Sequence, residues 1–242
     1  MTSIKINNLI LGIAIIALGF AALMVFGSSL GFWEPIVGFG LSRQYNNYLG
    51  MLVVVISVSR FAYLYQSKNR GLFKPFVSFV VGGIILCPAI MSFIVTPMRY
   101  PAIHDITTNV DNPPTFTFLD NNRKGAKNSL VYGGKKVSEQ QLKSYPQIQA
   151  ITTDSSITDA YKEAVIVAKS MGWNIVKEDL QDYHFEATAR TPFFNFVDDI
   201  VVEISHIGNG SRIDIRSVSR IGRGDRGVNA KRIMNYIKEF EQ

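Results

Sequence analysis

Nine polar side chains in the second half of the chain are candidates for a binding site. They are His104, Asp105, Arg216, Ser217, Ser219, Arg220, Asp225, Asn229 and Arg232. Arginine favours bidentate contacts with carboxylate and phosphate groups. The glycines of the loop IGRGDRG allow backbone N–H groups to converge before a helix N-terminus. This combination suits an anion, such as a lipid headgroup, a small anionic metabolite or the acidic side chain of a partner.

The orientation of these arginines depends on the predicted strand SRIDIRSVSR. A period of two places the isoleucines, Ser217 and Ser219 on one face and the arginines, Asp214 and Val218 on the other. We expect the isoleucines to face the core, so that Arg216 and Arg220 project together toward the glycine loop. The alternative is an internal role, in which aspartates bind these arginines and hold the last helix on the sheet. The candidate aspartates are Asp198, Asp199, Asp214 and Asp225.

Other patterns give little support for catalysis. His104 and Asp105 are adjacent, so in an extended chain they point to opposite sides and need distant partners to bind a metal. A histidine in a turn beside an Asx-type cap is the alternative interpretation. Asp198 and Asp199 diverge in the same way, whereas glycosidase chemistry needs two converging carboxyl groups. The chain has no nucleophile elbow, Walker loop, dinucleotide fingerprint or HExxH motif. We therefore expect no catalytic residues, no bound metal and no cofactor.

Composition indicates a membrane protein. Hydrophobic residues make up 47% of the 242 positions and charged residues only 18%. Three apolar stretches, at about 8–27, 48–65 and 76–95, are each close to the roughly 20 residues that a transmembrane helix needs. We therefore expect a three-helix membrane region over residues 1–97. A cleaved signal peptide is the rival interpretation of the first stretch, but the two later spans would still anchor the chain.

The distribution of charge predicts the orientation. Lys5, Lys68, Arg70 and Lys74 lie at one end of the predicted bundle, and Arg43 alone lies in the predicted first outer loop. Because Lys and Arg concentrate on the cytoplasmic side, we expect a cytoplasmic N-terminus and a periplasmic or otherwise extracytoplasmic C-terminal domain. Arg60 lies inside the second span, near its inner end. A charge there is a functional candidate, although its side chain is long enough to snorkel to the headgroups.

The chain beyond the membrane region is nearly neutral. Up to Pro97 there are six Lys or Arg residues and one acidic residue, which leaves 19 basic and 18 acidic residues for the remainder. A nucleic-acid-binding domain concentrates positive charge where phosphates dock, so we expect no nucleic-acid partner. Cys87 is the only cysteine, so the chain forms no internal disulfide.

The outer half divides into two segments. Residues 98–150 are rich in Pro, Asn and Asp, and we expect them to link or wrap a core without regular structure of their own. Residues 151–242 predict a helix after the Ser156–Asp159 capping box, about four mainly antiparallel strands, and a final helix that Asp225 caps. The expected fold class is therefore a three-span membrane α-helical region followed by an α+β extracytoplasmic domain.

Four linked motifs also carry a resemblance to a known family. They are YPAIHDITTNVDNPPTF, MGWNIVKED, FEATARTPFFNFVDDIVVEI and IDIRSVSRIGRGDRGVNAKRI, in this order. Together they resemble the domain-of-unknown-function family 1499, over about residues 98–240. The family occurs in bacteria and photosynthetic plastids, often behind membrane-spanning segments. The resemblance implies no reaction, substrate or catalytic residue.

These observations favour a membrane-anchored extracytoplasmic binding or accessory module. We expect its partners to be membrane lipid and a membrane protein complex, with an anionic small molecule as a further candidate. One alternative is a membrane-proximal hydrolase or metal-dependent enzyme that uses His104, Asp105 and the region from Arg216 to Arg232. The other is a lipid-handling or transport component, which is favoured if Arg60 faces the interior of the helix bundle.

Overall fold

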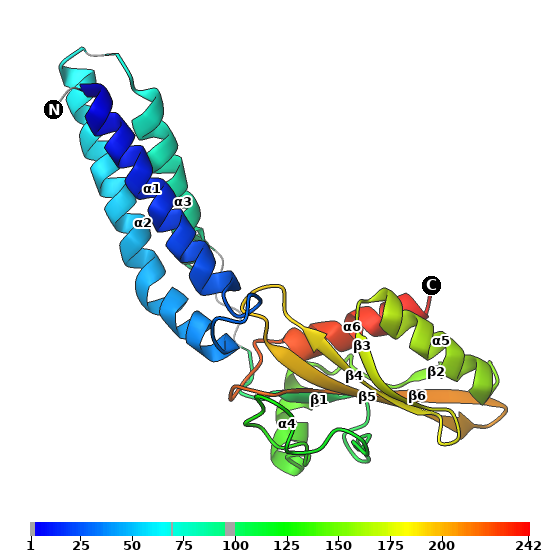
Figure 1. The fold of residues 1–242 in the computed structure, drawn as a ribbon. Helices are drawn as coiled ribbons and strands as arrows, with labels where there is room; N and C mark the ends of the chain where they lie inside the picture. Colours follow the sequence, from blue (N-terminus) through cyan, green and yellow to red (C-terminus); the bar gives the residue numbers. More distant parts are fainter. Residues whose placement is uncertain (1–2, 69, 95–99) are drawn as a thin grey trace. The chain divides into compact units, whose positions relative to one another are not determined.

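The computed structural model describes residues 3–68, 70–94 and 100–242, and the chain divides into two compact units. The first unit comprises Met1–Met98 and Pro192–Asn195, and the second comprises Arg99–Thr191 and Phe196–Gln242. Long helices form the first unit, whereas the second contains a sheet with shorter helices (Figure 1). We refer to them as the helical unit and the sheet unit.

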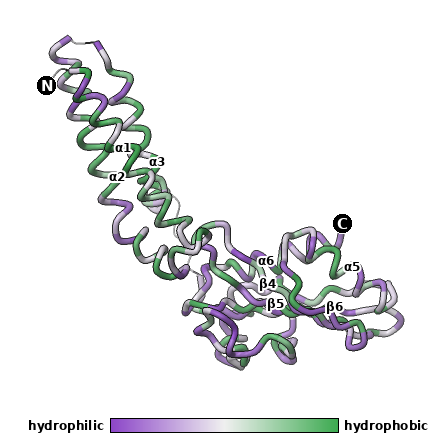
Figure 2. The backbone as a smooth tube through the Cα atoms, viewed as in Figure 1, coloured by the Kyte–Doolittle hydropathy of each residue, from purple (hydrophilic) through white to green (hydrophobic). Residues whose placement is uncertain are grey.

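Three helices form the helical unit: α1 (Ser3–Phe26), α2 (Pro35–Gln66) and α3 (Phe73–Ile94). Each is long and apolar enough to span a membrane. Hydrophobic residues run along all three helices, whereas the backbone of the sheet unit alternates between polar and apolar positions (Figure 2). The three spans predicted from hydropathy are therefore present as helices, except that Gly27 lies in the turn after α1 and residue 95 lies outside the described residues.

The second helix begins earlier than the sequence predicted. Residues 35–47 were expected in the first outer loop, but α2 already includes them. Pro35 occupies the first turn, where its fixed φ favours helix and its missing N–H is not needed. A helix of 32 residues is about 48 Å long, which exceeds the roughly 30 Å of hydrocarbon. Hydropathy detects only the apolar part of such a helix.

Small residues allow the three helices to approach one another. Ala14, Ala17 and Ala21 of α1 are buried against Val53 and Ile85. Between α2 and α3, a Cβ atom added at Gly82 would lie 2.8 Å from Val54 Cγ2 and 3.0 Å from the Val54 nitrogen. The next residue, Gly83, has no neighbouring atom within 4 Å of that position. Close packing therefore requires glycine at position 82 and not at position 83.

Gly82→Ala should destabilise the helical unit by about 1–3 kcal/mol, because the new methyl group overpacks the contact between α2 and α3. Gly83→Ala gains the same helix propensity without the clash and serves as the matched control. The measurement is unfolding of the detergent-solubilised protein by increasing SDS, followed by circular dichroism. Equal midpoints for the two variants would contradict this packing.

The sheet unit contains a six-stranded antiparallel sheet in the order β1-β6-β5-β4-β3, with β2 also paired to β6. The strands are β1 (Asp105–Thr107), β2 (Ile151–Thr153), β3 (Asn174–Asp179), β4 (His184–Arg190), β5 (Val197–Ile207) and β6 (Gly210–Ser219). The helices are α4 (Lys135–Ser144), α5 (Ile157–Ser170) and α6 (Val228–Phe240). Because β1 pairs with positions 216–218 of β6 and β2 with positions 211–213, these two strands lie end to end along one edge.

The strand count corrects the expectation of about four. β3 to β6 match the predicted strands, but β1 and β2 have only three residues each, which is too short to reveal a period of two. The segment 98–150 contains β1 and also α4, which the sequence did not predict. Helix α4 has few apolar residues, and its fully buried side chain is Gln141. That amide pairs with both backbone groups of Thr107 and covers the β1 edge.

Helices α5 and α6 cover one face of the sheet and build the apolar core. Ser156 caps α5 as predicted, because its Oγ accepts from the Asp159 N–H at 3.2 Å. Tyr236 of α6 donates to the Ala164 carbonyl at 2.7 Å, and its ring stacks on Trp173. The opposite face of the sheet carries no such helix pair and is covered by the irregular segment before α4 (Figure 1). We call these the helix face and the loop face.

Candidate functional site

The alternation predicted for β6 is present and separates the candidate residues between the two faces. Ile213 and Ile215 are fully buried in the core of the helix face. Ser217 and Ser219 continue along that face and bind Asn229 of α6. Arg216 and Arg220 lie on the loop face. The candidates therefore form two separate polar networks, one on each side of the strand.

Arg216 is enclosed and fully paired on the loop face. Arg216 is only 2% exposed to solvent. Nε and Nη2 donate to the two carboxylate oxygens of Asp105 at 2.9 and 2.8 Å, which is a bidentate ion pair. The guanidinium also donates to the carbonyls of Pro114 and Leu130. The rings of Phe116 and Tyr132 lie 5.5 and 5.3 Å from it.

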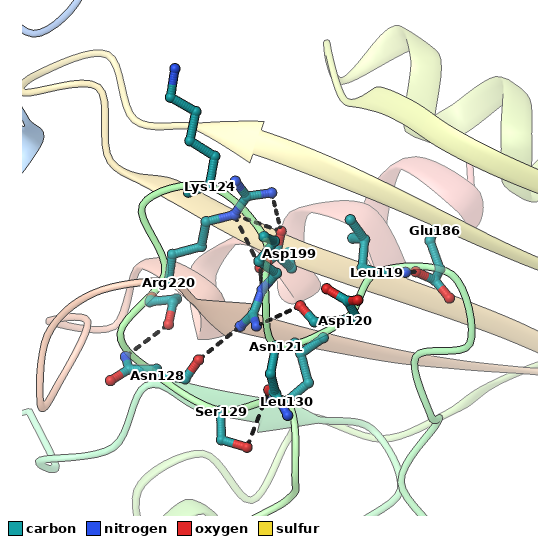
Figure 3. A network of polar contacts seen from close by, with 12 residues as sticks. Leu119, Asp120, Asn121, Lys124, Asn128, Ser129, Leu130, Glu186, Asp199 and Arg220 are labelled. Atoms are coloured by element: carbon teal, nitrogen blue, oxygen red, sulfur yellow. Dashed lines mark hydrogen bonds and ion pairs between the residues drawn. The ribbon is translucent and has the colours of Figure 1, made fainter.

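Arg220 shares one buried aspartate with a second arginine. Its Nε and Nη2 donate to Asp199 Oδ1 at 2.9 and 2.7 Å. Arg123 donates to the other oxygen, Oδ2. The contact network in Figure 3 joins Asp199 of β5 and Arg220, the residue after β6, to the loop residues Lys124 and Asn128. Asp199 is fully buried, so its charge depends on these two cations rather than on water.

Glu186 of β4 binds the loop by its backbone. Its carboxylate accepts from the N–H groups of Thr117, Phe118 and Leu119 at 2.6, 2.8 and 2.6 Å. Glu186 is fully buried, and Figure 3 shows it beside Leu119. An irregular segment has no strand ladder for its backbone donors, so a buried carboxylate supplies the acceptors. The loop face is therefore held by side chains that replace regular hydrogen bonding.

The helix-face network joins α6 to β5 and β6. Asn229 accepts from Ser217 Oγ at 2.6 Å and donates to Ser219 Oγ at 2.9 Å and to the His104 carbonyl at 3.1 Å. Arg232 donates to Asn229 Oδ1 and, through Nη2, to Asp198 Oδ2 at 2.6 Å. All of these polar atoms bind one another between the sheet and the helix. Their local effect is to fix the position of α6.

Asp225 occupies the helix N-terminus that was considered for an anion. Its carboxylate accepts from the Gly227 and Asn229 N–H groups at 2.9 and 2.7 Å. The predicted cap is thus offset, because Gly227 is the residue at the N-cap position, in the left-handed region with φ of 79°. Burial raises the pKa of Asp225, while the two N–H groups act in the opposite direction. The anion at this helix end is therefore a side chain of the protein itself.

The side chains of His104 and Asp105 bind different groups and do not converge on one site. The Asp105 side chain binds Arg216, whereas the ring Nδ1 of His104 lies 3.4 Å from the Arg223 carbonyl. Within residues 3–68, 70–94 and 100–242, no three His, Cys, Asp or Glu side chains are grouped so that they could hold a metal ion. Among the described residues, the structure brings all nine candidates to the two faces of β6 and the start of α6.

The ion pairs in the structure have the arrangement described above as the internal role of the arginines. Asp105, Asp199 and Asp198 bind Arg216, Arg220 and Arg232 respectively. Of the four aspartates considered from the sequence, Asp198 and Asp199 pair with candidate arginines, Asp214 forms an ion pair with Arg212, and Asp225 caps the helix. Sequence reasoning missed Asp105 as a partner, together with Arg123 and Glu186. An alternating strand gave no signal for Glu186, because an outward carboxylate is normally solvated.

Asp199→Asn should destabilise the sheet unit by about 3–5 kcal/mol, because it leaves Arg123 and Arg220 buried beside a neutral group. Asp154 is exposed, so Asp154→Asn makes the same chemical change and should alter the free energy of unfolding by less than about 0.5 kcal/mol. Urea unfolding followed by near-UV circular dichroism measures both. A small effect at Asp199 would show that water, rather than the arginines, supports its charge.

The burial of Tyr132 leads us to expect a loss of folding stability at alkaline pH. Its hydroxyl is buried and lacks a hydrogen-bond partner in the described structure. Burial, with the nearby Asp105 charge, raises its pKa from 10.0 to about 12. The folded state therefore retains the proton more tightly than the unfolded state, and this contribution is present below pH 10 and lost as the pH rises toward 12. Tyr132→Phe should flatten that part of the curve of melting temperature against pH, and an unchanged curve would contradict the assignment.

Two comparisons relate the chain to known proteins. The family model described as "Protein of unknown function (DUF1499)" matches residues 105–240, which include all six strands and α4 to α6. A search of curated proteins finds no match. The match begins at Asp105, the partner of Arg216, and covers more than half of the chain. The chain therefore belongs to the DUF1499 family, with three helices capable of spanning a membrane before the family domain.

Proposed function

We propose that this protein is a membrane-anchored binding or accessory module whose DUF1499 domain lies outside the cytoplasm and supports a membrane protein complex. The observation that carries the proposal is that the candidate arginines form ion pairs within the domain itself. Arg216, Arg220 and Arg232 are each bound to a buried aspartate. A domain whose charges are used for its own assembly is suited to act through its exposed surface.

The proposed location follows from charge. Lys5, Lys68, Arg70 and Lys74 lie where α1 begins, α2 ends and α3 begins. Because positive residues favour the cytoplasmic side, this end is assigned to the cytoplasm. A chain that crosses a bilayer three times then continues on the opposite side. The extracytoplasmic position of the sheet unit is thus part of the proposal.

The internal ion pairs also bear on the kind of ligand. An anionic small molecule at Arg216 and Arg220 would have to displace Asp105 and Asp199, both of which are buried. A hydrolase or metal-dependent enzyme would need Asp105 released from the same pair. A protein partner requires neither change, so we favour it. Among the described cations, Arg60 gives separate support to a lipid-related role, because it is buried within the helices.

Site-specific photo-crosslinking tests the proposal in intact cells. A photoreactive amino acid replaces, one at a time, exposed apolar residues of the sheet unit, namely Phe118, Val131, Leu142, Ile166 and Leu180. We expect one membrane protein to be captured reproducibly from positions that share one surface. Ile233 is fully buried, so the same substitution there is the matched control and should capture nothing. Labelling by a membrane-impermeant reagent on the same cells reports whether the domain is outside.

Two results would overturn the proposal. Capture of no protein from any of the five positions would contradict the binding role. Labelling of the sheet unit only after the membrane has been made permeable would contradict the extracytoplasmic location.

A further inference from the structure

The guanidinium of Arg60 lies inside the bundle of α1, α2 and α3. Arg60 is only 9% exposed, although it lies in a helix apolar enough to span a membrane. It is six residues from Gln66, the last residue of α2, which corresponds to about 9 Å of helix. Its side chain reaches the first turns of α1 instead of extending away from the helices. The bundle interior, rather than lipid alone, therefore surrounds this charge.

Among the described residues, the hydrogen-bond acceptors of Arg60 are neutral groups. Nε donates to Asn7 Oδ1 at 2.7 Å, and Nη2 donates to Ser3 Oγ at 2.6 Å and to the Ser3 carbonyl at 3.2 Å. The ring of Tyr63 lies 5.1 Å from its Cζ. Within residues 3–68 and 70–94 the single acidic residue is Glu34, the N-cap residue of α2, which lies about 39 Å along the helix axis from Arg60. In the part of the helical unit that the structure describes, no carboxylate therefore lies beside this positive charge.

Asn8, the residue after Asn7 in α1, holds a second cation near the same end of the bundle. Asn7, which accepts from Arg60, donates through Nδ2 to the Gly71 carbonyl at 3.1 Å. Asn8 accepts from Lys74 Nζ at the start of α3. Arg60 and Lys74 are therefore both tied to one turn of α1. The exposed side chains of Lys5, Lys68 and Arg70 add positive charge near this end of the helices.

We propose that an anionic phospholipid binds at this end of the bundle, with its phosphate group against Arg60 and Lys74. A phosphate supplies the missing negative charge and accepts hydrogen bonds from both cations. Apolar side chains continue outward beside the cations: Ile4 is 71% exposed and Phe73 is 75% exposed. These surfaces accommodate acyl chains, which favours a lipid over free phosphate. The inference requires the three helices to lie in a bilayer, but it does not require a protein partner for the sheet unit.

Native mass spectrometry of the full chain in detergent tests the inference, with phosphatidylglycerol and phosphatidylcholine titrated in parallel. We expect phosphatidylglycerol to bind preferentially. Lys74→Gln should weaken its binding about fivefold, and Arg60→Gln by at least as much, because each removes a charge near the phosphate. Arg43→Gln removes an exposed charge from the same helix about 26 Å away, and should leave lipid binding unchanged.

Two controls distinguish a loss of lipid binding from a loss of fold: the variant Arg60→Lys, and circular dichroism of every variant. Arg60→Lys keeps the charge and should bind more lipid than Arg60→Gln, while Lys74 lies at the start of α3, where its replacement leaves the helices intact. Equal binding of the two lipids, or an equal effect of Arg43→Gln and Lys74→Gln, would overturn the proposal. Displacement of the lipid by inorganic phosphate at the same concentration would show a free-phosphate site instead. Photo-crosslinking of the sheet unit is a separate readout, so either proposal can fail alone.

Discussion

Buried ion pairs on the loop face are the interaction on which the sheet unit depends. Arg216 with Asp105, and Arg123 and Arg220 with Asp199, are removed from water, so each charge is stable only with its partner in place. The first pair joins β1 to β6, and the second joins the loop to β5 and β6. Glu186 adds acceptors for three backbone N–H groups of that loop. These charged side chains thereby attach an irregular segment to the sheet.

The two faces of the sheet are therefore stabilised mainly by different interactions, apolar burial on one face and hydrogen bonds to charged groups on the other. On the helix face, α5 and α6 bury isoleucines beside the Asn229 and Arg232 network, and the apolar part of the stabilisation is non-directional and proportional to apolar area. On the loop face, directional hydrogen bonds to charged groups fix individual atoms. Removing one partner of a buried pair on this face leaves the other charge unpaired. An ion-pair network of this kind resembles a catalytic cluster in sequence, but it is already satisfied in the folded protein.

The helical unit presents the contrasting case. Small residues such as Gly82 allow the helices to approach, and most of their outward side chains are apolar. Arg60 is enclosed like Arg216, yet its acceptors are an asparagine and a serine instead of an aspartate. The same residue type thus has an internal counter-ion in one unit and, by our proposal, a lipid phosphate in the other. Charge balance, rather than burial, distinguishes the two sites.

The sequence by itself determined the elements whose side chains repeat with a clear period. The three apolar spans, the Ser156 cap and the strands β3 to β6 were predicted, and so was the separation of Ile215 from Arg216. Only the tertiary structure decided which partners the arginines take. Asp105 is 111 residues from Arg216, and the short β1 carries no periodic signal to place it there. Local patterns orient a side chain toward a face, but long-range pairing depends on the path of the whole chain.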